Sequence, residues 1–282
     1  MLAQPDFKSA MTTQWNAAAH GWNANGAIIR QWLRESTDAM IHMAAIKAGM
    51  NVLDVAAGAG DQTLDIAAKV GSAGHVVATD IAPCILEFAA HNAAQVGHNN
   101  IETIVADGED LPFDDASFDA AISRLGLMFF PDPQRGVNEI YRVLKSGGRF
   151  CAMVFSTPQT NPCLGIMMST ALKYAGLTPG DPYRAGGLLS LGKPDHINTL
   201  FEQAGFKDSV TTRVSAPFRL PSAHHYLEFV RGSAAPILQI MAKLDEASRA
   251  SAWAEMEAKL SAFNSENGWA GPNELLLTTG VK

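Results

Sequence analysis

The 282-residue chain is 47% hydrophobic and only 17% charged, and its 28 acidic and 21 basic side chains give a formal net charge of −7. This composition excludes an intrinsically disordered chain, which combines low hydrophobicity with high charge. It also argues against binding to nucleic acid by bulk attraction, because there is no surplus of basic residues to displace counterions.

The first 155 residues alternate between helical and extended patterns. Residues 1–45, which contain Trp15, Trp22 and Trp32, are predicted to be helical. Short apolar runs that predict strands follow at 51–55, 75–79, 101–106, 118–123 and 149–155. Apolar residues at helical spacing lie between them at 64–70, 83–96 and 137–144. Strands that alternate with helices in this way predict a parallel sheet covered on both faces.

The second half of the chain departs from this alternation. Residues 156–192 and 222–268 combine loops rich in proline and glycine with amphipathic helices, one of them expected over 237–263. A helix at 197–204 and strands at 209–214 and 274–281 are also predicted. The expected organisation is an N-terminal helical lid (1–45), a ligand-binding core (46–155), two substrate-lid insertions (156–192 and 222–268), and two segments that complete the sheet (193–221 and 269–282).

A glycine turn, Gly58-Ala59-Gly60, stands between the first predicted strand and the next helix. Such a turn lets a ligand approach the backbone closely and leaves amide N–H groups free. Asp80 follows Gly60 by 20 residues, at the end of the second strand, where a carboxylate can hold both hydroxyls of a ribose. An ordinary tight turn would explain the glycines alone, but strand, turn and acid together predict a cofactor that carries a nucleoside.

Two residues of the following helix bear on which nucleoside is bound. The dinucleotide fingerprint has a third glycine where this chain has Thr63, and Asp61 at the helix N-terminus would repel a pyrophosphate. Oxidoreduction with NAD is therefore disfavoured. A cofactor that carries an ammonium and a sulfonium in place of phosphates suits this acidic turn better, which indicates S-adenosyl-L-methionine.

Several stretches of the chain carry a resemblance to a known family: 52–61, 78–83, 106–113, 117–119 and 141–149. In these the chain resembles the class I S-adenosylmethionine-dependent methyltransferases, specifically the ubiquinone/menaquinone biosynthesis C-methyltransferases. Ala56 departs from the family's motif, which often has a glycine there. The resemblance implies an α/β fold with a Rossmann-like, doubly wound, mostly parallel sheet of seven strands, the last antiparallel, with a helical N-terminal addition and a lid.

The resemblance also implies which residues bind the cofactor. Gly58 would pass beneath its methionine part, and Asp54 would face the ammonium. Asp80 would hold the ribose hydroxyls, and Asp107 would accept the amine of the adenine. The full set expected at the cofactor is Asp54, Ala56, Gly58, Gly60, Asp80, Ile81, Asp107, Gly108, Ser123 and Trp22.

The sulfonium methyl group is already an electrophile, so the enzyme mainly has to align a nucleophile with it. We expect transfer to a small hydrophobic or aromatic acceptor by in-line displacement, with O- or C-methylation favoured. The sequence contains no evident catalytic dyad, and the catalytic residue is not identified. The histidines considered as a general base are His20, in the N-terminal segment, and His196, His224 and His225 in the C-terminal half. The residues expected at the acceptor pocket are Arg124, Trp15, Met128 and Met167.

Two other functions stay open: a protein that binds S-adenosylmethionine without catalysis, and an arsenite methyltransferase. For the latter Cys84, Cys151 and Cys163 are few and unclustered, and they match no disulfide or metal spacing, so no metal site is expected. Cysteines that match no disulfide spacing are typical of a reducing compartment. The sequence shows no membrane span, and Asp6 lies where a secretory signal would need an apolar core, so we expect a cytoplasmic protein. We expect a small-molecule substrate, no nucleic-acid partner, and a monomer or homodimer.

Overall fold

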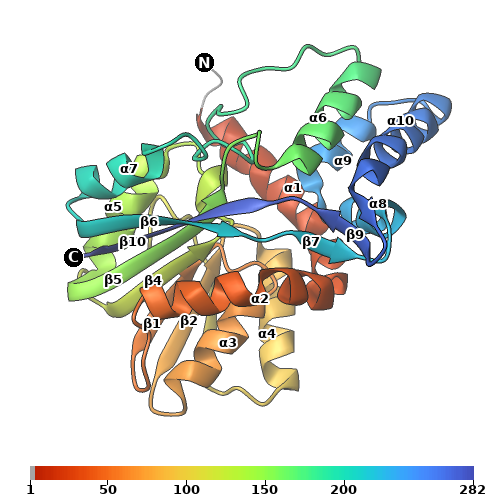
Figure 1. The fold of residues 1–282 in the computed structure, drawn as a ribbon. Coiled ribbons are helices and arrows are strands. Elements are labelled where there is room, and N and C mark those ends of the chain that lie inside the picture. The colour runs from red at the N-terminus through yellow and green to blue at the C-terminus, as the bar shows by residue number, and fades with distance from the viewer. Residues whose placement is uncertain (1–3) are drawn as a thin grey trace.

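A mixed sheet of seven strands forms the centre of the computed structural model, which describes residues 4–282 (Figure 1). The strand order is β3-β2-β1-β4-β5-β10-β6. The strands are β1 (Asn51–Val55), β2 (His75–Asp80), β3 (Ile101–Val105), β4 (Phe118–Arg124), β5 (Leu144–Phe155), β6 (Lys207–Ser215) and β10 (Glu274–Val281). Strand β10 is antiparallel to both of its neighbours, and β1 to β5 run parallel to one another. The predicted fold, including the antiparallel last strand, is confirmed.

The central strands are buried on both faces, as the apolar runs in the sequence predicted. In β1 and β4 almost every residue is buried, which is typical of parallel strands covered by helices on both sides. Strand β5 begins at Leu144, five residues earlier than expected. The register with β4 shifts between Phe118 and Ala120, which accommodates Gly147 in its left-handed conformation.

Two groups of helices cover the sheet (Figure 1). In one group α2 packs on α3 and α3 on α4, and in the other α5 packs on α7. Their bounds are α2 (Gly26–Met43), α3 (Asp61–Val70), α4 (Pro83–Gln95), α5 (Pro133–Val143) and α7 (His196–Ala204). Both groups leave the carboxyl ends of the parallel strands free, which is where ligands of such sheets bind.

A lid built from the N-terminal helix and from segments further along the chain lies over those strand ends (Figure 1). It consists of α1 (Gln4–Ala24), α6 (Pro162–Tyr174), α8 (Ala223–Ser233), α9 (Ala235–Met241), α10 (Glu246–Leu260) and the short helices η1 (Leu127–Phe129) and η2 (Ser261–Phe263). A small sheet in the order β7-β9-β8 supports it, formed by β7 (Phe218–Leu220), β8 (Asn264–Ser265) and β9 (Gly268–Gly271). Among the described residues, no helix combines the length and apolar character needed to cross a membrane.

The prediction of a single helix over 237–263 was wrong, because two helices, α9 and α10, span this segment. The chain leaves α9 after Met241 and starts a new helix at Glu246. Asp245 caps that new helix, because its side chain accepts a hydrogen bond of 2.8 Å from the amide of Ser248. An N-cap of this kind stabilises a helix start inside a segment whose apolar pattern would otherwise continue.

Helix α1 crosses α8 at a contact between two glycines. A Cβ added at Gly21 would stand 1.6 Å from the carbonyl oxygen of Gly232. The backbones therefore approach closer than any side chain at Gly21 would allow. This crossing holds α1, which carries Trp15 and Trp22, against the C-terminal part of the lid.

Candidate functional site

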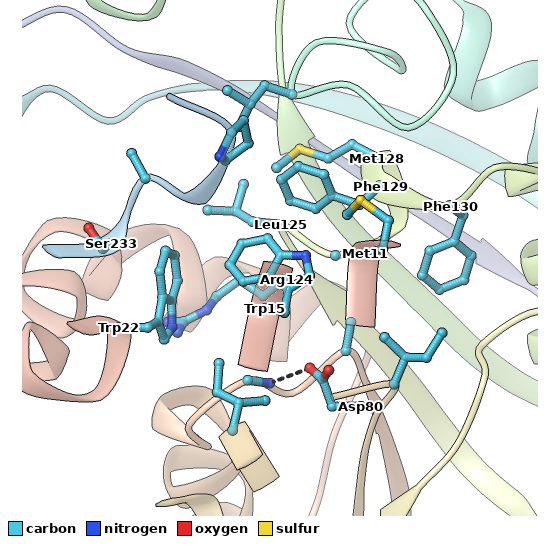
Figure 2. Close-up of a pocket in the computed structure, with 18 of the residues that line it drawn as sticks. Met11, Trp15, Trp22, Asp80, Arg124, Leu125, Met128, Phe129, Phe130 and Ser233 are labelled. Atoms are coloured by element: carbon cyan, nitrogen blue, oxygen red, sulfur yellow. Dashed lines mark hydrogen bonds between the residues drawn. The ribbon is translucent and has the colours of Figure 1, made fainter. Parts of the chain in front are cut away.

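A cavity of about 180 Å³ lies between the strand ends and the lid (Figure 2). The residues expected at the site that line it are Trp15, Trp22, Ala56, Gly58, Asp80, Ile81, Asp107, Gly108, Arg124, Met128 and Met167. Figure 2 shows Trp15, Trp22 and Arg124 pointing into the space that Asp80 borders from below. The structure thus gathers in one cavity most of the residues expected at the cofactor and at the acceptor.

Asp80 ties the glycine turn to the end of β2. One carboxylate oxygen accepts a hydrogen bond of 3.1 Å from the amide of Gly58, and the other accepts one of 3.0 Å from the amide of Ala82. Gly58 and Gly60 both have positive φ angles, of 60° and 85°, which glycine adopts without strain. Burial raises the pKa of Asp80 to about 6, although the backbone N–H groups act in the opposite direction.

Four of the expected residues do not line the cavity: Asp54, Gly60, Ser123 and His20. Asp54 is fully buried behind the turn, where it accepts hydrogen bonds from Thr63 Oγ1 at 2.6 Å and from Gln62 Nε2 at 3.1 Å. Its carboxylate therefore fastens the turn to α3 rather than facing the cavity. Burial raises the pKa of Asp54 to about 6 as well.

The other three residues take supporting or outside positions. Gly60 is the residue before α3, and a Cβ there would lie 3.0 Å from the Cβ of Ala89. Ser123 is buried beneath Gly126, and its hydroxyl has no hydrogen-bond partner among the described residues. His20 is exposed on α1, with its ring centroid 6.2 Å from that of Phe88.

The floor of the cavity is made where β1 and β4 end. A Cβ added at Gly126 would stand 2.3 Å from the Cβ of Ala56, so the two chains approach closely there. Ala56 and Leu125 both have a φ angle of 58°, a left-handed conformation that a residue with a side chain rarely adopts. Strained backbone of this kind concentrates at functional sites, because the surrounding fold has to hold it in place.

Arg124 brings a positive charge to the wall of the cavity. Its side chain is 4% exposed, Nη1 donates a hydrogen bond of 3.1 Å to Thr37 Oγ1, and Nη2 lies 3.7 Å from a carboxylate oxygen of Asp61. Burial lowers the pKa of Arg124 and raises that of Asp61, while the attraction between the two charges opposes both shifts. The guanidinium makes no other hydrogen bond to the residues whose side chains the structure describes, so it keeps donors for a ligand.

Lys8 ties α1 across the mouth of the cavity. Its ammonium forms ion pairs with Asp107 and with Glu109, the latter at 2.6 Å. Asp107 also accepts a hydrogen bond of 2.9 Å from the amide of Glu109. The sequence offered no signal for this contact, because Lys8 is far from both partners along the chain.

The lid side of the cavity is aromatic and apolar. The centroid of Trp15 lies 5.2 Å from that of Phe129, and the centroid of Trp32 lies 4.4 Å from that of Phe218. Further apolar lining comes from Phe155, Leu164, Met167, Leu188, Phe229, Val230 and Ile237. The cavity is therefore polar along the strand ends and apolar beneath the lid.

The three cysteines occupy different environments. Cys84 is exposed on α4, while Cys151 and Cys163 are buried in β5 and α6. Burial raises the pKa of the Cys163 thiol to about 12, and that of Cys151 is raised further. Within residues 4–282, no group of three or more His, Cys, Asp or Glu side chains is placed to hold a metal ion. These environments give no support to arsenite chemistry, which needs reactive thiolates.

Comparisons with known proteins show the family of the chain. The model of the ubiE/COQ5 methyltransferase family matches residues 27–173. The ubiquinone/menaquinone biosynthesis C-methyltransferase of Haemophilus ducreyi is 32% identical over 189 residues, which cover 64% of this chain and 71% of that enzyme. The demethylmenaquinone methyltransferase of Clavibacter sepedonicus is 44% identical over 111 residues, covering 39% of this chain and 43% of that enzyme.

Solved structures share the fold. The YcgJ protein of Bacillus subtilis superposes with a TM-score of 0.59 at 20% identity, covering 88% of this chain and 98% of its own. The [4+2]-cyclase SpnF superposes with a TM-score of 0.56 at 20% identity, covering 88% of this chain and 80% of its own. Because one of these neighbours is a cyclase, the fold by itself does not identify the reaction.

Proposed function

This chain belongs to the ubiE/COQ5 methyltransferase family, and we propose that it transfers a methyl group from S-adenosyl-L-methionine to a small hydrophobic or aromatic acceptor. Its membership makes it an S-adenosylmethionine-dependent methyltransferase. Family membership does not identify the acceptor, and we infer its class from the cavity. The observation that carries it is the division of the cavity into a polar strand edge and an aromatic, apolar space beneath the lid.

The residues along the strand edge fit the cofactor. Each carboxylate oxygen of Asp80 accepts one hydrogen bond from a backbone N–H and has a further lone pair with which it can accept a hydrogen bond from a ribose hydroxyl. Gly58 presents bare backbone, and a Cβ there would come within 3.5 Å of Trp22 Nε1. Ile81 and Asp107 would address the adenine. Bound there, S-adenosyl-L-methionine supplies an electrophilic methyl group that needs no further activation.

The chain itself would then position and ionise the acceptor. The aromatic residues beneath the lid, Trp32 and Phe218 among them, would hold a ring by stacking and edge contacts. The free donors of Arg124 would stabilise an acceptor oxygen in its anionic form, which is the better nucleophile for O-methylation and for C-methylation beside a phenolate. No histidine lines the cavity among the described residues, so in this route the acceptor gives up its proton to solvent water as it binds, and the buried cation of Arg124 stabilises the resulting anion.

A methyl-label transfer assay tests the proposed acceptor class. The protein would be incubated with S-adenosyl-L-[methyl-14C]methionine and two panels of compounds, one of phenols and naphthols and one of polar amines, amino acids and sugars. We expect labelled product from the first panel, together with an equal amount of S-adenosyl-L-homocysteine. Labelled product from the polar panel alone would contradict an apolar acceptor.

Cofactor binding should weaken in acid because of Asp80. Its pKa of about 6 in the free protein means that the carboxyl takes up a proton as the pH falls through that value, and a protonated carboxyl accepts the ribose hydroxyls poorly. By calorimetry, we expect a constant Kd for S-adenosyl-L-homocysteine above about pH 7 and a rise approaching tenfold per pH unit below about pH 6.

Asp54 provides the control for this pH dependence, since it titrates in the same range but lies outside the cavity. The Asp54→Asn variant should keep the dependence on pH. A Kd that stays constant down to about pH 5 in the wild-type protein would show that Asp80 is not the group that receives the cofactor.

A further inference from the structure

Tyr226 of α8 is a buried aromatic residue that lines the cavity. The side chain is 3% exposed, and its ring stacks on Trp269 with centroids 4.6 Å apart and meets Phe218 edge-on at 5.2 Å. The ring is thus held on two sides by aromatic neighbours. Its hydroxyl makes no hydrogen bond to any residue whose side chain the structure describes, although a buried tyrosine hydroxyl usually finds a partner.

We infer from the surroundings of Tyr226 that its hydroxyl faces the cavity. Fully buried polar atoms that lack a partner occur in Arg30, Asp61, Ser123, Gln134 and Ser209, but not in Tyr226. The hydroxyl of Tyr226 therefore has accessible surface. Because the residue is otherwise buried and lines the cavity, that surface belongs to the cavity.

Asn273 is a second polar group beside the same aromatic residues. It is 5% exposed, lines the cavity, and uses its amide nitrogen in a hydrogen bond of 3.3 Å to the carbonyl of Gly271. Gly271 ends β9 and pairs with Phe218 of β7, so Asn273 lies two residues beyond the strand that supports Phe218. The lid side of the cavity is consequently apolar with a polar corner, rather than apolar throughout.

We propose that the Tyr226 hydroxyl donates a hydrogen bond to an oxygen of the acceptor, so that the acceptor is an aromatic molecule with a carbonyl or ether oxygen remote from its methylated end. The inference rests on the proposed function and deepens it. Arg124 on the strand side would receive the anionic oxygen next to the methylated position, and Tyr226 on the lid side would receive the second oxygen. Burial, with a smaller contribution from Cys163, raises the pKa of Tyr226 well above its ordinary value, so the hydroxyl keeps its proton far beyond neutral pH.

A pair of bicyclic phenols that differ in one oxygen tests the inference. The probes are 6-hydroxy-1-tetralone, which has a ketone, and 5,6,7,8-tetrahydro-2-naphthol, which does not. Their binding would be measured by calorimetry with the protein saturated with S-adenosyl-L-homocysteine. The ketone also makes the phenol more acidic, which favours its anion at Arg124 in both proteins. We therefore expect the preference for the ketone over the tetrahydronaphthol to fall about tenfold from the wild-type protein to the Tyr226→Phe variant.

Two controls separate this role from a structural one. Tyr226→Phe keeps the ring, so its Tm and its Kd for S-adenosyl-L-homocysteine should match the wild-type values. Tyr141 packs outside the cavity against Phe206, and the Tyr141→Phe variant should keep the preference for the ketone.

The outcomes distinguish the inference from the proposed function. If the wild-type protein binds both probes equally, or if Tyr226→Phe keeps the full wild-type preference, the role of Tyr226 is wrong while the aromatic acceptor stands. If neither probe binds to the protein saturated with S-adenosyl-L-homocysteine, the proposed acceptor class fails and the role of Tyr226 fails with it.

Discussion

The Asp80→Asn variant should bind S-adenosyl-L-homocysteine about 100-fold more weakly than the wild-type protein, or worse. Hydrogen bonds to a charged group contribute about 1.5–3 kcal/mol each, and the proposed site assigns two ribose hydroxyls to this carboxylate. Asparagine also sets an amide N–H₂ against the N–H of Gly58 or of Ala82, each of which donates to Asp80 in the structure. The Kd would be measured by calorimetry at about pH 8, where the carboxyl of Asp80 is ionised.

Asp38→Asn is the matched control, because Asp38 is exposed on α2 and does not line the cavity. The Asp38→Asn variant should bind S-adenosyl-L-homocysteine with the same Kd as the wild-type protein. Thermal unfolding of both variants would show whether Asp80→Asn is still folded. A folded Asp80→Asn variant whose Kd stays within about threefold of the wild-type value would remove Asp80 from the cofactor site.

The Gly21→Ala substitution should lower the free energy of unfolding by about 3 kcal/mol and abolish methyl transfer. The added methyl group would stand 1.6 Å from the carbonyl oxygen of Gly232, so α1 has to move away from α8. Since α1 carries Trp15 and Trp22, which line the cavity, this movement opens the wall of the site. Urea denaturation followed by tryptophan fluorescence would measure the loss.

Gly165 of α6 offers the same substitution in a helix without the steric conflict. A Cβ there meets nothing within 4 Å. Gly165→Ala should therefore stabilise the protein by about 0.5–1 kcal/mol, because alanine favours the helix more than glycine does. If Gly21→Ala proved as stable as Gly165→Ala, the packing of α1 on α8 would not be the one described.

The sheet could be predicted from the sequence because its signals are local. The central strands β1, β2 and β4 are short apolar runs, and the turn at Gly58 and Gly60 marks the point where β1 ends and α3 begins. The small sheet of β7, β8 and β9 gave no such signal, since Phe218 pairs with Gly271 across many residues of chain. The break between α9 and α10 was missed for a different reason: the cap at Asp245 outweighs an apolar pattern that continues through it.

The site was predictable to the same degree. Asp80 and Gly58 could be assigned from their positions at strand ends. Position at a strand end does not say which way a side chain turns, and Asp54 turns toward Gln62 and Thr63 of α3 instead of the cavity. Lys8, Tyr226 and Asn273 reach the cavity only through the packing of the lid, which no local pattern records.

The most direct test of this account is a crystal structure of the protein with S-adenosyl-L-homocysteine and 6-hydroxy-1-tetralone bound together. We expect the ribose hydroxyls on Asp80, the phenol ring beneath the lid against Trp32 and Phe218, and the phenol oxygen near Arg124. S-adenosyl-L-homocysteine bound away from Asp80, or the phenol bound outside the cavity, would contradict the proposed function.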